Sequence, residues 1–191
     1  MMRATLLKFR LNALLRCDFL RKQDGSISIE AMIVLPVMFW AFLAAFSIFD
    51  AFRMYGINQK AAFTVGDAIS RETLPLDDDY LDGVHNLFEY LSLSEGKSAM
   101  RVTSIWFDED NNSYRTDWSQ TRGNAVALTN AEVQNWHNRL PVMPDNERVL
   151  LVETWSDYVP PFATGLEERE IQNFVFTRPR YAPRVCWEYC N

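Results

Sequence analysis

The hydrophobic pattern of this chain is dominated by one long apolar run near its N-terminus. Residues 31–49 carry no formal charge, and Asp50 ends the run. In a helix that rises 1.5 Å per residue this run would extend about 28 Å, close to the hydrocarbon thickness of a bilayer. The pattern therefore predicts a membrane-spanning helix over residues 26–49.

After the apolar run the helical pattern continues over residues 50–75 in a more polar form. Phe52, Tyr55, Gln59, Phe63, Gly66 and Ile69 recur at helical spacing among Arg53, Asn58, Lys60, Asp67 and Arg71. This second half suits packing against a globular head. Leu74-Pro75 is expected to end the helix, because proline disfavours helix in the preceding residue. Pro36 lies in the apolar half, where a membrane helix tolerates it as a kink.

Residues 76–191 change to shorter patterns and are expected to form an α+β head. An acidic loop, Asp77 to Gly83, precedes a helix predicted over residues 81–93, with Val84, Leu87, Phe88 and Leu91 facing inward. Alternation predicts a strand over residues 100–107, and residues 114–118 can pair back on it. Residues 149–155 are the strongest predicted strand, and residues 171–176 are a further one. Thr129 and Glu132 form a capping-box pattern at the start of a short helix. The predicted fold is a long, partly transmembrane helix whose C-terminal half packs on a small antiparallel sheet.

The distribution of charge along the chain predicts how the apolar run is oriented in the membrane. Residues 1–25 are basic, and because the whole chain has a net charge of −6, the remainder is strongly acidic. By the positive-inside rule the leader stays in the cytoplasm and the head is extracytoplasmic or periplasmic, so we expect a single-pass protein of the inner (cytoplasmic) membrane. An acidic head also argues against nucleic-acid binding.

The leader does not resemble a secretory signal peptide. Charges interrupt residues 2–22 every few positions, so no apolar region of the required length exists there. Its leucines fall on one helical face, which fits either an amphipathic helix on the inner leaflet or a disordered basic tail. The apolar run also lacks a good signal-peptidase site before Asp50, so the span is expected to be retained.

The three cysteines are divided between the leader and the head. Cys17 lies in the leader, whereas Cys186 and Cys190 lie near the end of the head. In an oxidising compartment this pair can form a disulfide, although two free thiols are the alternative. The small loop would place its stabilisation at the low end of the usual range.

Motifs for catalysis or for cofactor and metal binding are missing from the sequence. His85 and His137 lack ligands at metal-binding spacing, so we interpret both as structural residues. Asp108, Asp110 and Asn112 alternate as in a calcium loop. However, Ser113 and Ser119 stand where an EF-hand needs glycine and glutamate. Without a phosphate-binding glycine loop or a nucleophile elbow, we expect no enzyme activity, no cofactor and no metal.

Glu30 is the residue that a plain membrane anchor does not explain. A carboxylate at the start of a lipid-facing helix is costly and is a functional hypothesis by default, although a position at headgroup depth would make it ordinary. If the chain were cut after Gly25, the new α-ammonium group of Ser26 would lie about one helical turn from Glu30. The two charges could then neutralise each other, within one chain or between neighbours.

This arrangement resembles the class III signal of type IV pilins and pseudopilins. Gly25 matches the residue before the prepilin peptidase cut, Ser26 the new N-terminus and Glu30 the characteristic glutamate. With Pro36 in the apolar run, residues 21–72 are most similar to TadE-like (TadE/TadF) minor pseudopilins of the tight-adherence (Flp) pilus system. Residues 178–187 are similar to the same family. Bulk Flp pilins are short and carry Glu-Tyr, whereas this chain has Glu30-Ala31 and a large head.

The resemblance implies a structural role in pilus assembly and cell adhesion. Prepilin peptidase would remove residues 1–25, and Glu30 and Pro36 would act in helix assembly. The expected partners are prepilin peptidase, other pilins or pseudopilins, the inner-membrane assembly platform and membrane lipid. The alternative is an unprocessed, single-span extracytoplasmic binding or sensor protein.

Overall fold

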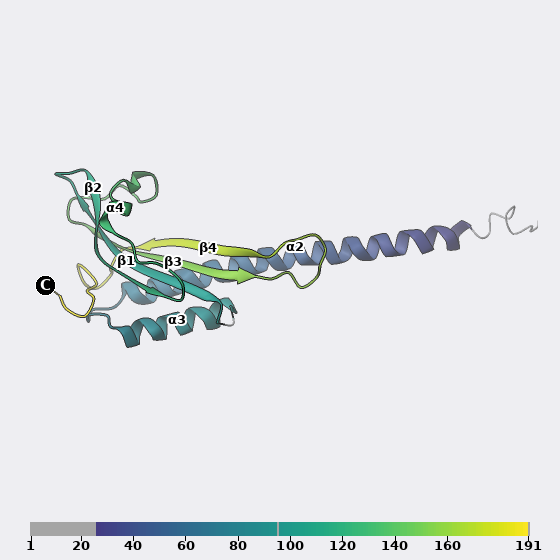
Figure 1. Ribbon diagram of the computed structural model, residues 1–191, viewed down its shortest axis with the longest axis horizontal. Helices are drawn as coiled ribbons and strands as arrows, with labels where there is room; N and C mark the ends of the chain where they lie inside the picture. Colours follow the sequence, from purple (N-terminus) through teal and green to yellow (C-terminus); the bar gives the residue numbers. More distant parts are fainter. Residues whose placement is uncertain (1–25, 95, 191) are drawn as a thin grey trace, which may run out of the picture. The chain divides into compact units, whose positions relative to one another are not determined.

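A computed structural model describes residues 26–94 and 96–190, which form an α+β fold (Figure 1). The elements follow in the order α2 (Ser26–Ser70), α3 (Asp78–Ser92), β1 (Ser98–Asp108), β2 (Ser113–Arg122), α4 (Asn130–Val133), the 3-10 helix η3 (Trp136–Asn138), β3 (Arg148–Tyr158) and β4 (Arg169–Thr177). The chain divides into two compact units, at Phe46 and Ser47. The predicted leader, Gly25 included, lies outside the described residues.

Helix α2 has 45 residues and contains Pro36. It ends at Ser70, slightly before the predicted Leu74-Pro75 stop. There, the Arg180 backbone N–H donates to the Ser70 carbonyl at 2.8 Å, and Asp67 forms ion pairs with Arg71 and Arg180 at 2.8 and 2.7 Å. The Arg180 hydrogen bond occupies one of the carbonyl groups that every helix leaves unpaired at its C-terminus.

The face that α2 buries agrees with the predicted one only at its end, where Gly66 and Ile69 are buried. Phe52 and Phe63 are 74% and 53% exposed, whereas the buried residues are mostly small: Asn58, Ala61, Ala62, Val65, Ile69 and Ser70. Small side chains let a helix backbone approach a sheet closely, and a row of phenylalanines would hold it away. The prediction that Asn58 belongs to the polar surface was therefore wrong, because Asn58 is 1% exposed.

Helix α3 begins earlier than predicted, inside the acidic run. The Asp77 carboxylate accepts the Tyr80 N–H at 2.8 Å as an N-cap, and Asp78 and Asp79 occupy the first turn. Carboxylates are favourable there because the N-terminus carries the positive end of the helix dipole. Val84 and Phe88 are buried as predicted, but Leu87 is 39% exposed.

The four strands form one antiparallel sheet in the order β2-β1-β3-β4. β1 and β2 make the predicted hairpin, with a register shift between Ser104 and Ile105. β3 lies between β1 and β4 and is buried along most of its length. The observed strands are longer than predicted at both ends, because ladder hydrogen bonds continue after the hydrophobic alternation fades.

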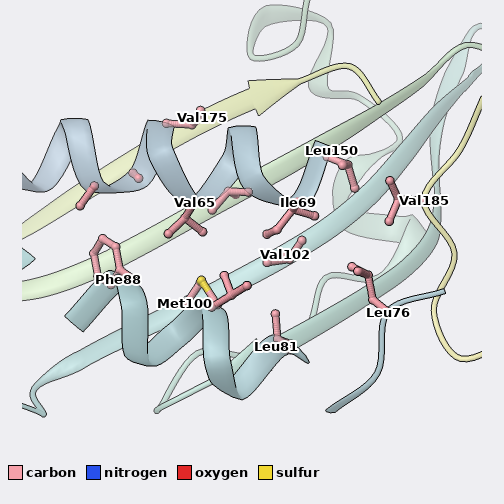
Figure 2. Close-up of a cluster of buried hydrophobic side chains, with 14 residues drawn as sticks. Val65, Ile69, Leu76, Leu81, Phe88, Met100, Val102, Leu150, Val175 and Val185 are labelled. Carbon is pink, nitrogen blue, oxygen red and sulfur yellow. The ribbon is translucent and has the colours of Figure 1, made fainter. Parts of the chain in front are cut away.

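One face of the sheet packs against α2 and α3. Val65 and Ile69 of α2 meet Leu81 and Phe88 of α3 over Met100, Val102, Leu150, Val152 and Val175 of the strands (Figure 2). Leu76 and Val185, from the segments after α2 and β4, close one end of this core. The apolar sides of the two helices and the apolar side of the sheet thus pack against each other.

The opposite face of the sheet is covered in part by the connection from β2 to β3. Leu128, Val133, Leu140 and Met143 of this connection pack on Ile105, Tyr114, Val149 and Leu151. At the start of α4, the Glu132 carboxylate accepts the Thr129 backbone N–H at 2.8 Å, as the capping-box pattern predicts. The part of this sheet face that the connection leaves uncovered carries charged and aromatic side chains.

Candidate functional site: the apolar half of helix α2 and its anchor in the head

The first half of α2 exposes apolar side chains on all sides. Ile27, Met32, Leu35, Phe39, Trp40, Phe42 and Phe49 are each more than half exposed. A helix in water buries at least one apolar stripe, and one that is apolar all round belongs in a membrane or a protein interior. This helix, near the N-terminus, is long and apolar enough to span a membrane.

The residues predicted for processing and assembly lie at the start of this helix. Ser26 is its first residue, Glu30 follows about one turn later with an exposed side chain, and Pro36 is in its interior. Residues 31–49 add no further charge. Glu30 is therefore the carboxylate that the apolar half of the helix carries at its beginning.

The head holds the following turns of α2 through polar contacts at the end of β3. The Tyr158 hydroxyl donates to Oδ2 of Asp50 at 3.2 Å, with the Ser47 carbonyl oxygen as a second acceptor at 3.4 Å. Burial, followed by the hydrogen bond to Asp50 and its charge, raises the pKa of Tyr158 above its usual value. The first charged residue after the apolar run is thus fixed to the sheet.

Two turns further along, Asn58 makes a second anchor inside the core. Ser156 donates through Oγ to Oδ1 of Asn58 at 2.6 Å, and Nδ2 of Asn58 donates to the Met54 carbonyl at 3.0 Å. Because both side chains are almost fully buried, loss of either partner would leave an unsatisfied polar group. This pair fixes the rotation of α2 about its axis relative to β3.

The C-terminal segment closes the other end of the head. Cys186 and Cys190 form a disulfide with their Cα atoms 5.3 Å apart. Leu76 donates its N–H to the Cys186 carbonyl at 2.9 Å, and its own carbonyl accepts the Glu188 N–H at 2.7 Å. Residues 185–190, called the C-terminal clasp below, therefore attach to the connection between α2 and α3.

The histidines and the acidic turn have local partners. Nε2 of His85 lies 3.0 Å from the Ser98 hydroxyl, and the His137 ring contacts Phe107 and Tyr114. Asp108 accepts hydrogen bonds from Asn111, which lower the pKa of its carboxyl group, with a smaller contribution from Arg115. Within residues 26–94 and 96–190, no three His, Cys, Asp or Glu side chains gather as a metal site.

Sequence reasoning missed the residues that hold the head together across long separations. Asn58 and Ser156 are far apart in the chain, and Arg101 and Glu153 form a buried ion pair with a 2.6 Å contact. The signal in the sequence was a charged or polar residue at a position that the hydrophobic pattern places in the interior. Glu153 interrupts the most apolar strand in that way, between Val152 and Thr154.

Comparisons with protein-family models, with curated proteins and with solved structures give no match.

Proposed function

We propose that this chain is a TadE-like minor pseudopilin, a structural and assembly component of a tight-adherence type IV pilus that prepilin peptidase processes after Gly25. One observation carries the proposal. An apolar, outwardly exposed helix bears a carboxylate at Glu30, five residues after Gly25, and runs without interruption into a half that packs on an antiparallel sheet. A plain anchor has no use for that carboxylate or for a glycine at that distance.

The proposed sequence of events uses these residues in order. The basic leader holds the N-terminus in the cytoplasm while the head crosses the membrane. Cleavage after Gly25 removes the leader and leaves the α-ammonium group of Ser26 near the Glu30 carboxylate. Two opposite charges one turn apart, or on neighbouring helices, offset the cost of placing either one beside lipid. The uncharged helix that follows can then pack with other pilin-type helices.

Exposed aromatic residues at the end of the apolar half and beyond it support the same role. Phe49, Phe52 and Phe63 are more than half exposed on a helix whose opposite side packs on the sheet. Large apolar side chains left at a surface are typical of a helix that has a partner. The partners proposed here are the helices of other pilins or pseudopilins and the inner-membrane assembly platform.

Intact mass tests the processing step. The full chain is co-expressed with a prepilin peptidase, and the product is expected to lose residues 1–25. Gly25→Ala should block this loss. Gly56→Ala is the matched control, because an added Cβ at Gly56 of helix α2 meets nothing within 4 Å. An uncut chain that still reaches the membrane would instead support the unprocessed single-span protein.

Glu30→Gln tests the assembly step. The variant is expected to be processed normally but to be lost from the pilus fraction sheared from cells that carry the tight-adherence machinery. The amide keeps the size of the side chain and removes its charge. Glu168→Gln makes the same change at an exposed position of the head and should assemble like the unmodified chain. Normal assembly of Glu30→Gln would exclude the charge-pairing account.

A further inference from the structure

The face of the sheet opposite α2 carries a row of side chains set by strand register. Arg101 of β1 pairs with Glu153 of β3, and Glu153 pairs with Phe174 of β4. Directly paired residues point to the same side of a sheet. Trp136 and Arg139, from η3 and the residue after it, reach this row and contact Phe174.

Arg101 and Glu153 satisfy each other within this row. The Glu153 side chain is 2% exposed, and its Oε2 accepts from Nε and Nη2 of Arg101 at 2.7 and 2.6 Å. Nη1 of Arg101 donates to the Val126 carbonyl at 2.7 Å. The second carboxylate near Arg101 is Glu132, which accepts the backbone N–H and the hydroxyl of Thr129. Neither carboxylate depends on Arg139 for its hydrogen bonds.

Within the described residues, Arg139 lies against two aromatic rings and forms only a long ion pair with a carboxylate. Its Cζ atom lies 4.4 Å from the Trp136 ring centroid and 4.5 Å from that of Phe174, and the two centroids are 6.1 Å apart. These distances place the guanidinium in the corner between two tilted rings. Its nearest carboxylate oxygen, Oε1 of Glu153, is 3.8 Å from Nη2. Among the residues that the structure describes, its guanidinium makes no hydrogen bond.

We propose that Arg139 anchors a docking site for a carboxylate side chain on an extended, acidic segment of a partner protein. A guanidinium in an aromatic corner is already oriented, so little side-chain entropy remains to be lost when its paired N–H donors meet a carboxylate. The side chain is 47% exposed and can be reached. Trp136 and Phe174 add the apolar walls that, with arginine, characterise interface hot spots.

The geometry favours a carboxylate over a phosphate group. Oε1 of Glu153 lies 3.8 Å from Nη2 of Arg139, and Oε2 of the same carboxylate is paired with Arg101. Glu153 would repel a phosphate dianion more strongly than it would repel a singly charged carboxylate. An extended segment fits because Phe174 belongs to β4, which is an edge strand of the sheet. The site is independent of cleavage after Gly25.

Peptide binding to the full chain in uncharged detergent micelles tests the site. The probe is a labelled, capped peptide with a central glutamate between valines and threonines, and its partner carries glutamine instead. Anisotropy is expected to show about tenfold tighter binding of the glutamate peptide, as for one charge-assisted hydrogen-bonded pair. Arg139→Gln should abolish this preference, and Arg139→Lys should retain part of it.

Arg115→Gln is the matched control, because Arg115 is also half-exposed and lies over a tryptophan ring but already bonds Asp108 at 2.8 Å. It should leave the preference intact. Equal binding of both peptides, no binding of either, or an unchanged preference in Arg139→Gln would overturn the proposal. Stronger competition by inorganic phosphate than by acetate would overturn the carboxylate assignment. Light scattering that shows an Arg139-dependent dimer would overturn the separate partner in favour of a second copy of this chain.

Discussion

Gly123 closes the turn after β2 at a point where the backbone of β1 leaves no space for a side chain. Its φ is +73°, in the left-handed region, and an added Cβ would lie 2.5 Å from the Ser98 carbonyl oxygen. Neither the conformation nor the contact suits any other residue. The hairpin register that pairs Met100 with Arg122 therefore depends on this glycine.

Gly123→Ala is expected to lower the free energy of unfolding by about 2–4 kcal/mol, from left-handed strain and from the forced movement of β1. Chemical denaturation of the full chain in micelles measures this change. Gly96→Ala is the control, because Gly96 has a similar φ of +78° but open space around it. It should cost only about 1 kcal/mol. Equal effects of the two variants would show that the contact with Ser98 contributes nothing.

Residues such as Asn58 and Arg139 also show where sequence reasoning stops. Asn58 sits among polar neighbours on a helix, and its burial depends on Ser156, which is distant in the chain. The site of Arg139 needs a ring from η3 and another from β4. A local pattern identifies which face is apolar, but it does not identify a polar partner that only the tertiary fold brings near.

At the scale of elements, the patterns predicted the existence and type of each main helix and strand. Hydropathy and length were enough for α2, period-2 alternation was enough for β1, and the strands β3 and β4 were also predicted. The rotation of α2 on the sheet was not predicted, because aromatic residues mark the strongest helical stripe and yet remain exposed. Side-chain size decides that rotation, since Ala61, Ala62 and Val65 allow closer packing than phenylalanine.

Substitutions on the two sides of α2 test this orientation. Ile69 is fully buried against the sheet, whereas Phe63 is 53% exposed. Ile69→Ala should reduce the free energy of unfolding by about 2–5 kcal/mol, because it leaves a cavity. Phe63→Ala should change it by less than about 0.5 kcal/mol. Denaturation of both variants in micelles gives the comparison, and a larger loss for Phe63→Ala would mean that α2 packs in the other orientation.

At the scale of the whole head, segments from far apart in the chain close one core. Leu76 and Val185 share that core, and Trp118 of β2 donates its ring N–H to the Val185 carbonyl at 2.9 Å. The sequence offered Cys186 and Cys190 as a possible pair, with two free thiols as the alternative. It gave no sign of their attachment to Leu76, because backbone hydrogen bonds between irregular segments leave no residue pattern. The C-terminal clasp thus joins the connection after α2 to the edge strand β2.

Opening the disulfide should weaken the attachment of the C-terminal clasp to the connection between α2 and α3. Cys190→Ser is expected to cost about 2 kcal/mol or less, since the closed loop is short. The local effect should exceed the global one: amide exchange at Leu76 and Glu188, whose N–H groups form the clasp hydrogen bonds, should accelerate. Cys17→Ser serves as the control for loss of a thiol. If Cys190→Ser leaves both amides as protected as before, the hydrogen bonds and the buried Val185 hold the clasp without the disulfide.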